Sequence, residues 1–151
     1  DPAATALMGK IAIANSKVVY QRFKELFHGQ DYEDLKASGA GVQRLLWAST
    51  STKNPDYPDT LYVDGLIGPE TVNTMPPKTI DAFRDHGRLS YSLEEDVEEA
   101  QLLLDNLVEL GIDLDEVTEK LQDDGVKSFS DSFDQLIDTL RQKVEQMGAK
   151  A

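Results

Sequence analysis

The spacing of apolar side chains changes from helical to strand-like near residue 44. Upstream, residues 5–27 place apolar side chains three, four or seven positions apart, which predicts one long helix: Met8, Ala12, Val19, Phe23 and Leu26. A polar loop containing Gly29, Gly39 and Gly41 is expected next. The run at residues 44–49 is then apolar without alternation, from Leu45 to Ala48. This pattern predicts a strand that is buried on both faces, as in a parallel sheet.

A second strand is predicted after a short helix. The segment DTLYVDGLIG has Asp59 as a candidate N-cap and Gly68 as a candidate residue just beyond the C-terminus, although an edge strand is the alternative there. Residues 70–75 favour extended structure and are ended by two prolines. Pro77 suits the first turn of a helix that would stop at Gly87. The order is that of a βαβα unit in a parallel sheet.

Beyond residue 90 the period is helical throughout. The sequence SLEE at residues 92–95 reads as a capping box for a helix that ends at Gly111. DLDE at residues 113–116 resembles a second capped start, for a helix that would end at Gly125. A last helix is expected from about Ser130 to Met147, with its apolar side chains on one face.

Charge divides the chain at the same place as the change of pattern. Residues 1–88 hold 11 acidic and 10 basic side chains, whereas residues 89–151 hold 17 acidic and 5 basic ones, and the whole chain has a net charge of −13. We therefore distinguish an α/β segment, residues 1–88, from an acidic helical extension, residues 89–151. Such an extension would repel a phosphate backbone, so nucleic acid is not an expected partner.

Composition restricts the chemistry further. The chain has 151 residues, 40% of them hydrophobic and 28% charged, which is typical of globular proteins. No apolar run approaches a membrane span and the first residues lack the pattern of a signal peptide, so no membrane partner and a cytoplasmic location are expected. With no cysteine and only two histidines, neither a metal nor a cofactor is predicted.

Candidate chemistry is concentrated at the end of the first predicted strand, in the sequence RLLWASTSTKNP. The hydroxyl groups of Ser49 and Ser51 and the ammonium group of Lys53 could hold a phosphate, which binds best to several donors and one or two cations. A capped loop is the alternative interpretation of these hydroxyl groups. None of the ten lysines has the apolar, desolvating setting that a Schiff-base lysine needs, so no catalytic residue is predicted in this chain.

Three stretches resemble the C-terminal part of a transaldolase, of the longer type found in cyanobacteria, actinobacteria and plants and in fusions with glucose-phosphate isomerase. These stretches are GKIAIANSKVVYQRFKELF, QRLLWASTSTKNPDYPDTLYVDGLIGPETVNTMPPKTIDAFRDHG and LGIDLDEVTEKLQDDGVKSFSDSF. The resemblance implies a (β/α)8 TIM barrel, with residues 44–49 on the seventh strand, residues 71–75 on the eighth, and residues 8–27 as the helix before the seventh strand.

The resemblance also implies a function and a role for the hydroxyl-rich loop. Transaldolases transfer a dihydroxyacetone unit between sugar phosphates in the pentose phosphate pathway, through a Schiff base on a lysine of the fourth strand. In the family, a serine at the end of the seventh strand and a basic residue just beyond it hold the substrate phosphate. Ser49 matches that serine. Ser51 or Thr52 stands where shorter transaldolases have arginine, and Lys53 is the expected substitute.

A complete barrel of this kind needs roughly 200 to 250 residues, and the strands that bear the family's lysine and its acid/base carboxylates are absent here. The chain is therefore expected to be inactive alone and to work beside an N-terminal portion of the same enzyme. The alternative is a non-catalytic acidic helical fragment that self-associates. The family allows a plastid location if the source is a plant.

Overall fold

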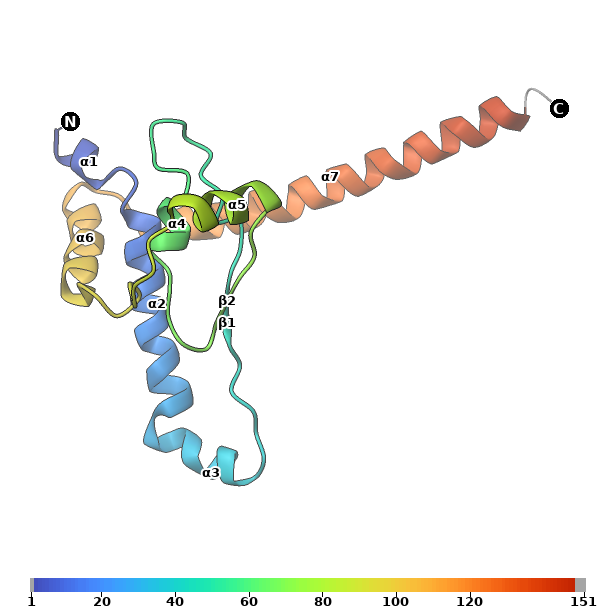
Figure 1. Cartoon of the computed structure of the whole chain (residues 1–151). Coiled ribbons are helices and arrows are strands. Elements are labelled where there is room, and N and C mark those ends of the chain that lie inside the picture. The colour runs from blue at the N-terminus through green and yellow to red at the C-terminus, as the bar shows by residue number, and fades with distance from the viewer. Residues whose placement is uncertain (1, 149–151) are drawn as a thin grey trace. The chain divides into compact units, whose positions relative to one another are not determined.

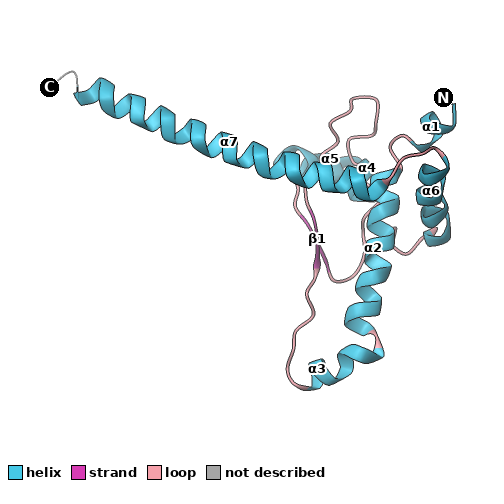
Figure 2. Cartoon of the chain, turned by 180° about the vertical axis from the view of Figure 1, so that it is seen from behind, coloured by secondary structure: helices cyan, strands magenta, loops and turns pink. Residues whose placement is uncertain are grey.

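The computed structural model describes residues 2–148, in two compact units that divide after Leu110. The first unit contains both strands and six α-helices among its described residues, and the second consists of one long helix (Figures 1 and 2). Packing thus assigns the first helix beyond residue 90 to the strand-containing unit. The predicted distinction between a barrel segment (1–88) and an extension (89–151) rests on charge and resemblance, and it stays a prediction.

The single helix predicted over residues 5–27 is in fact two helices, α1 (Pro2–Leu7) and α2 (Ile11–His28). Gly9 separates them with a φ of +77°, a left-handed conformation that an α-helix does not contain. Met8 is 60% exposed and does not belong to the buried face of α2. Instead, α2 buries Ala14, Tyr20 and Phe23.

The polar segment after α2 is not only a loop. It contains a short 3-10 helix, Gln30–Tyr32, followed by α3 (Glu33–Ala37). The acidic side chains in the first turn of α3, Glu33 and Asp34, suit the positive end of the helix dipole. Glycine is absent from these residues, and Gly39 and Gly41 follow α3 in the chain leading to the first strand.

The two predicted strands form and pair in parallel, as expected. Strand β1 (Leu45–Trp47) lies beside β2 (Thr71–Asn73), with Leu45 opposite Thr71 and Trp47 opposite Asn73. The predicted burial on both faces is wrong for this chain, because Leu46 is 54% exposed. Side chains alternate between the faces of a strand, and Leu45 and Trp47 pack on the covered face. Leu46 lies on the opposite face, where its cross-strand neighbour Val72 is half-buried.

A short helix joins the strands, as predicted, but its ends differ from the prediction. Helix α4 comprises Leu61–Asp64, with Thr60 at its N-cap and Gly65 at its C-cap. Asp59 is not the cap, because its carboxylate is hydrogen bonded to His86. Gly68 does not end the helix either. A side chain at Gly68 would clash with Leu93, since a Cβ there would lie 2.8 Å from Leu93 Cδ1.

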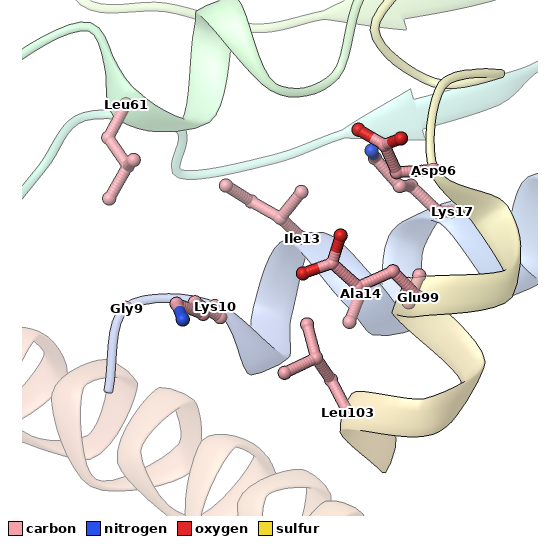
Figure 3. A pocket seen from close by; sticks show the side chains of 10 residues that line it. Gly9, Lys10, Ile13, Ala14, Lys17, Leu61, Asp96, Glu99 and Leu103 are labelled. Atoms are coloured by element: carbon pink, nitrogen blue, oxygen red, sulfur yellow. The ribbon is translucent and has the colours of Figure 1, made fainter. Parts of the chain in front are cut away.

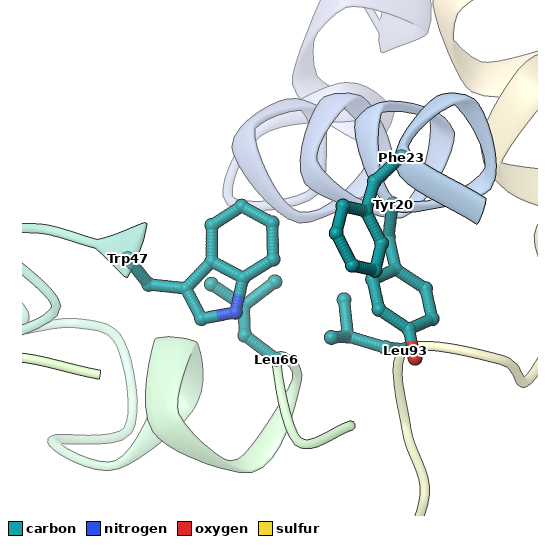
Figure 4. Close-up of a cluster of buried hydrophobic side chains, with 5 residues drawn as sticks. All are labelled: Tyr20, Phe23, Trp47, Leu66 and Leu93. Atoms are coloured by element: carbon teal, nitrogen blue, oxygen red, sulfur yellow. The ribbon is translucent and has the colours of Figure 1, made fainter. Parts of the chain in front are cut away.

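The hydrophobic core joins α2, β1, the segment between α4 and β2, and the loop around Leu93. Figure 4 shows the five buried side chains of this core: Tyr20, Phe23, Trp47, Leu66 and Leu93. The first two are aromatic side chains of α2. The centroids of the Tyr20 and Phe23 rings lie 5.8 Å apart in a stacked arrangement. Leu93 is fully buried. Burial, together with the nearby carboxylates of Glu94 and Glu70, raises the pKa of the Tyr20 hydroxyl.

Helices α5 (Pro77–His86) and α6 (Val97–Glu109) complete the first unit. The predicted positions of Pro77 in the first turn of α5 and of Gly87 after it are confirmed. The capping box predicted at residues 92–95 is wrong. Helix α6 begins two residues after it, and the buried Ser92 hydroxyl accepts a hydrogen bond from the backbone N–H of Ile67 instead. Helix α6 packs against α2 and ends, as predicted, just before Gly111.

The second unit is one continuous helix, α7 (Leu114–Gly148). Asp113 caps its start, as predicted, because its carboxylate accepts hydrogen bonds from the N–H groups of Asp115 and Glu116. The predicted break between Gly125 and Ser130 is wrong, since a lone glycine lowers helix stability by only about 1 kcal/mol. No residue of α7 is buried. Its exposed apolar side chains recur three or four residues apart: Val126, Phe129, Phe133, Leu136, Leu140, Val144 and Met147.

None of the helices in the described part of the chain is both long enough and apolar enough to span a bilayer.

Candidate functional site

The candidate site is a cavity at the carboxyl end of β1, with a volume of about 450 Å³. Residues 47–51 form one wall, and the rest comes from the following loop and from α2 and α4: Ala12, Ser16, Trp47, Ala48, Ser49, Thr50, Ser51, Lys53, Asn54, Tyr62 and Leu66. All three residues predicted from the sequence line this cavity. Among its described lining residues, Lys53 is the one with a charged side chain, so the cavity is electropositive and suits an anion.

Lys53 and Ser51 are in direct contact. The Nζ atom of Lys53 donates a hydrogen bond to the backbone oxygen of Ser51 at 3.2 Å and another to the Ser51 hydroxyl oxygen. The side chain of Lys53 therefore folds back over its own loop, although the residue remains exposed. This places a cation and a hydroxyl group side by side on the cavity wall, which is the combination that a phosphate oxygen accepts hydrogen bonds from.

Ser49 lies two residues beyond the end of β1 and is exposed. Its φ is +56°, a left-handed conformation that residues with a side chain rarely adopt. Strained backbone of this kind is concentrated at functional sites, where the surrounding structure maintains it. Glu70 and Asp96 share this backbone conformation, and Ser49 is the one of these three residues that lines the cavity.

Thr50 and Asn73 were not predicted as site residues, yet they join the two strand ends. The Thr50 hydroxyl, in a residue only 3% exposed, donates to Oδ1 of Asn73 at 2.7 Å. One weak signal could have indicated this pair, because asparagine is depleted in strands and stands in the middle of TVNT. Its partner, 23 residues away, could not be inferred from a local pattern.

A second cavity, of about 230 Å³, lies between α2, α4 and the start of α6 (Figure 3). Two lysines and two carboxylates line it: Lys10, Lys17, Asp96 and Glu99. The ammonium group of Lys17 already donates to the backbone oxygen of Glu95 at 2.6 Å. With equal numbers of positive and negative groups, this lining does not favour an anion. We therefore place the candidate phosphate site at Ser49 and Lys53.

No lysine among residues 2–148 is buried. A Schiff-base lysine needs desolvation or a neighbouring cation to be neutral and nucleophilic. Within the same residues, histidine and carboxylate side chains form no group of three or more that could hold a metal ion. The arrangement can therefore bind an anionic group, and the described lysines lack the setting for covalent catalysis.

A parallel pair of strands with a polar, electropositive carboxyl end is the kind of segment that α/β enzymes use for phosphorylated ligands. The family model for transaldolase/fructose-6-phosphate aldolase matches residues 2–140, and the chain belongs to this family.

Curated relatives agree with the family match. The chain is 48% identical over 151 residues to a transaldolase of Parafrankia sp. (strain EAN1pec), an alignment that covers 99% of this chain and 40% of that protein. It is 46% identical to transaldolase 2 of Nostoc punctiforme, covering 93% of the chain and 37% of the relative. A transaldolase of Neisseria meningitidis serogroup C is 50% identical over 87% of the chain and 37% of its own length. The chain thus spans about two fifths of these relatives, and the predicted family resemblance is confirmed.

Proposed function

We propose that this chain is the C-terminal portion of a transaldolase and that it holds the phosphate group of the sugar-phosphate substrate. In the complete protein, a dihydroxyacetone unit is transferred between sugar phosphates through a Schiff base on a lysine outside this chain. The observation that carries the proposal is the cavity at the carboxyl end of β1, where Ser49, Ser51 and Lys53 line one electropositive wall. None of the described lysines is buried, which supports a catalytic lysine elsewhere.

The partner that we propose is the N-terminal portion of the same enzyme, which would supply the remaining strands of a (β/α)8 barrel. The two-stranded sheet supports this proposal, because β1 and β2 each have one strand neighbour and Leu46 of β1 is 54% exposed. Strands of parallel sheets are ordinarily paired on both edges and covered on both faces. The exposed apolar side chains of α7 give a second reason, since such surfaces ordinarily mark interaction sites.

The alternative, a non-catalytic fragment that self-associates, is not favoured. Relatives that are 44–51% identical over most of this chain bear the name transaldolase. Nothing in their names points to a structural or binding role.

The proposal can be tested by complementation with a relative. The chain would be coexpressed with the N-terminal three fifths of the Parafrankia transaldolase, the part that it does not match. We expect a complex of the two polypeptides that transfers dihydroxyacetone between sugar phosphates, and neither part alone should do so. After borohydride reduction with a ketose phosphate, mass spectrometry should find the adduct on the N-terminal part. An adduct on a lysine of this chain, or a stable complex without transfer, would refute the proposal.

A further inference from the structure

Side-chain and backbone hydrogen bonds tie the carboxyl ends of β1 and β2 together on both sides of Ser49. After Ser49, the hydroxyl of Thr50 lies 2.7 Å from Oδ1 of Asn73 and 3.2 Å from the backbone oxygen of Thr74. Before Ser49, the backbone oxygen of Trp47 accepts hydrogen bonds from the N–H and the hydroxyl of Thr74, at 3.0 and 3.1 Å. Two residues of β1's end are therefore fixed to β2, and Ser49 lies between them.

The left-handed backbone at Ser49 needs such a constraint. A residue with a Cβ leaves this conformation when nothing holds it, because the extended and right-handed regions are lower in energy. Thr50, the next residue, is only 3% exposed and its side chain is hydrogen bonded to Asn73, so water has limited access to this bond. Competition from water ordinarily weakens a hydroxyl hydrogen bond. The low exposure of Thr50 reduces this competition and strengthens its hydrogen bond to Asn73.

We propose that Thr50 and Asn73 are positioning residues of the phosphate site. Their hydrogen bond holds Ser49 in the left-handed conformation, and this conformation aims the Ser49 hydroxyl and the loop up to Lys53 at the phosphate. Neither residue is required to touch the phosphate. The inference rests on the proposed role of Ser49, but its first half, the dependence of the Ser49 backbone on Thr50, can be measured without any ligand.

Isosteric variants of the isotopically labelled chain separate positioning from folding. Thr50→Val keeps the shape of the side chain and removes the hydroxyl, whereas Thr50→Ser keeps the hydroxyl. Thr60→Val is a matched control, because Thr60 is also 3% exposed and donates to Oδ2 of Asp64 at 2.7 Å, away from the two strands. NMR chemical shifts would report the backbone conformation of Ser49, and titration with inorganic phosphate, followed at the Ser49 and Ser51 amides, would give Kd.

In Thr50→Val we expect the backbone chemical shifts of Ser49 to move away from the values typical of a left-handed conformation. We also expect the Kd for phosphate to rise about tenfold, as for the loss of one charge-assisted hydrogen bond. Thr50→Ser should restore both readouts, and Thr60→Val should change neither. If Ser49 keeps its conformation and its affinity in Thr50→Val, the positioning role is wrong while the phosphate site stands. If the unmodified chain shows no shift change at Ser49 or Ser51 with phosphate, the proposed site itself fails, together with the positioning role.

Discussion

The Nε2 atom of His86, at the end of α5, lies 2.8 Å from Oδ1 of Asp59, in the loop between the candidate site and α4. The Nδ1 atom of the same imidazole lies 3.1 Å from Oδ2 of Asp85. The hydrogen bond to Asp59, followed by that to Asp85, raises the pKa of His86 above its ordinary 6.5. The hydrogen bond from His86 also lowers the pKa of Asp59 below its ordinary 3.8.

This pair predicts a pH-dependent contribution to stability. A raised His pKa stabilises the folded state fully below pH 6.5, and the contribution is lost as the pH rises through the folded-state pKa. The lowered pKa of Asp59 contributes above pH 3.8 and is lost as the pH falls through the folded-state pKa. The Tm difference between the unmodified chain and His86→Gln should therefore be largest between these two values and shrink toward alkaline pH.

Asp81→Asn is a suitable control for this measurement. Asp81 pairs with Arg84 on the same helix at 3.8 Å, and the arginine stays charged across the range in which a histidine titrates. The Tm difference between Asp81→Asn and the unmodified chain should be constant between about pH 5 and about pH 8.5. An NMR titration midpoint for His86 at or below 6.5 would contradict the raised pKa.

Substitution of glycine by alanine should have opposite effects on stability at Gly111 and at Gly125. A Cβ would meet no neighbouring atom at Gly111 or at Gly125, so space does not distinguish them. Gly125 lies inside α7, where alanine should stabilise the helix by roughly 0.5 to 1 kcal/mol. Gly111 has a φ of +73°, where alanine should destabilise by roughly 1 to 2 kcal/mol. Urea unfolding and far-UV circular dichroism of both variants would measure this, and lower helicity in Gly125→Ala would show that α7 is broken there.

The elements that the sequence predicts correctly are those with local signals. Pro77 in a first helical turn, Gly111 after a helix and the unbroken apolar run at Leu45–Trp47 each act within a few residues. The parallel pairing followed from the order of the elements. Leu46 was predicted to be buried because its run is typical of a complete parallel sheet, whereas the sheet of the described residues has two strands and Leu46 is 54% exposed.

Two of the errors have a common physical cause, which is competition from distant partners. Ser92 fits a capping box, but its hydroxyl accepts from Ile67, 25 residues away. Asp59 fits an N-cap, but its carboxylate is held by His86, 27 residues away. In the candidate site, Ser49, Ser51 and Lys53 could be grouped from the sequence because they are neighbours in one loop, and their binding of phosphate stays a prediction. Thr50 and Asn73 were missed for the same reason that Ser92 and Asp59 were misread.

The proposed phosphate-binding role of Lys53 predicts a change in substrate affinity in the complex with the Parafrankia N-terminal portion. Lys53→Ala removes the cation beside Ser51, so KM for sugar phosphates should rise several-fold or more, because charge-assisted hydrogen bonds contribute about 1.5 to 3 kcal/mol. Lys36→Ala is the control, since Lys36 is an exposed lysine of α3 whose neighbour is Glu33. An equal rise of KM in both variants would mean that net charge, and not a bound phosphate, sets the affinity.

Two substitutions at Ser49 separate the contribution of its hydroxyl group from that of its backbone conformation. Ser49→Gly removes the hydroxyl and relieves the strain of the left-handed φ, whereas Ser49→Ala removes the hydroxyl and keeps the strain. If the hydroxyl binds the phosphate, both variants should raise KM for sugar phosphates several-fold, and Ser49→Gly should be at least as stable as the unmodified chain. Reaction with non-phosphorylated dihydroxyacetone should be nearly unchanged in both, because the phosphate serves mainly as a binding handle. An equal loss with both substrates would show that Ser49 shapes the mouth of the site and does not bind phosphate.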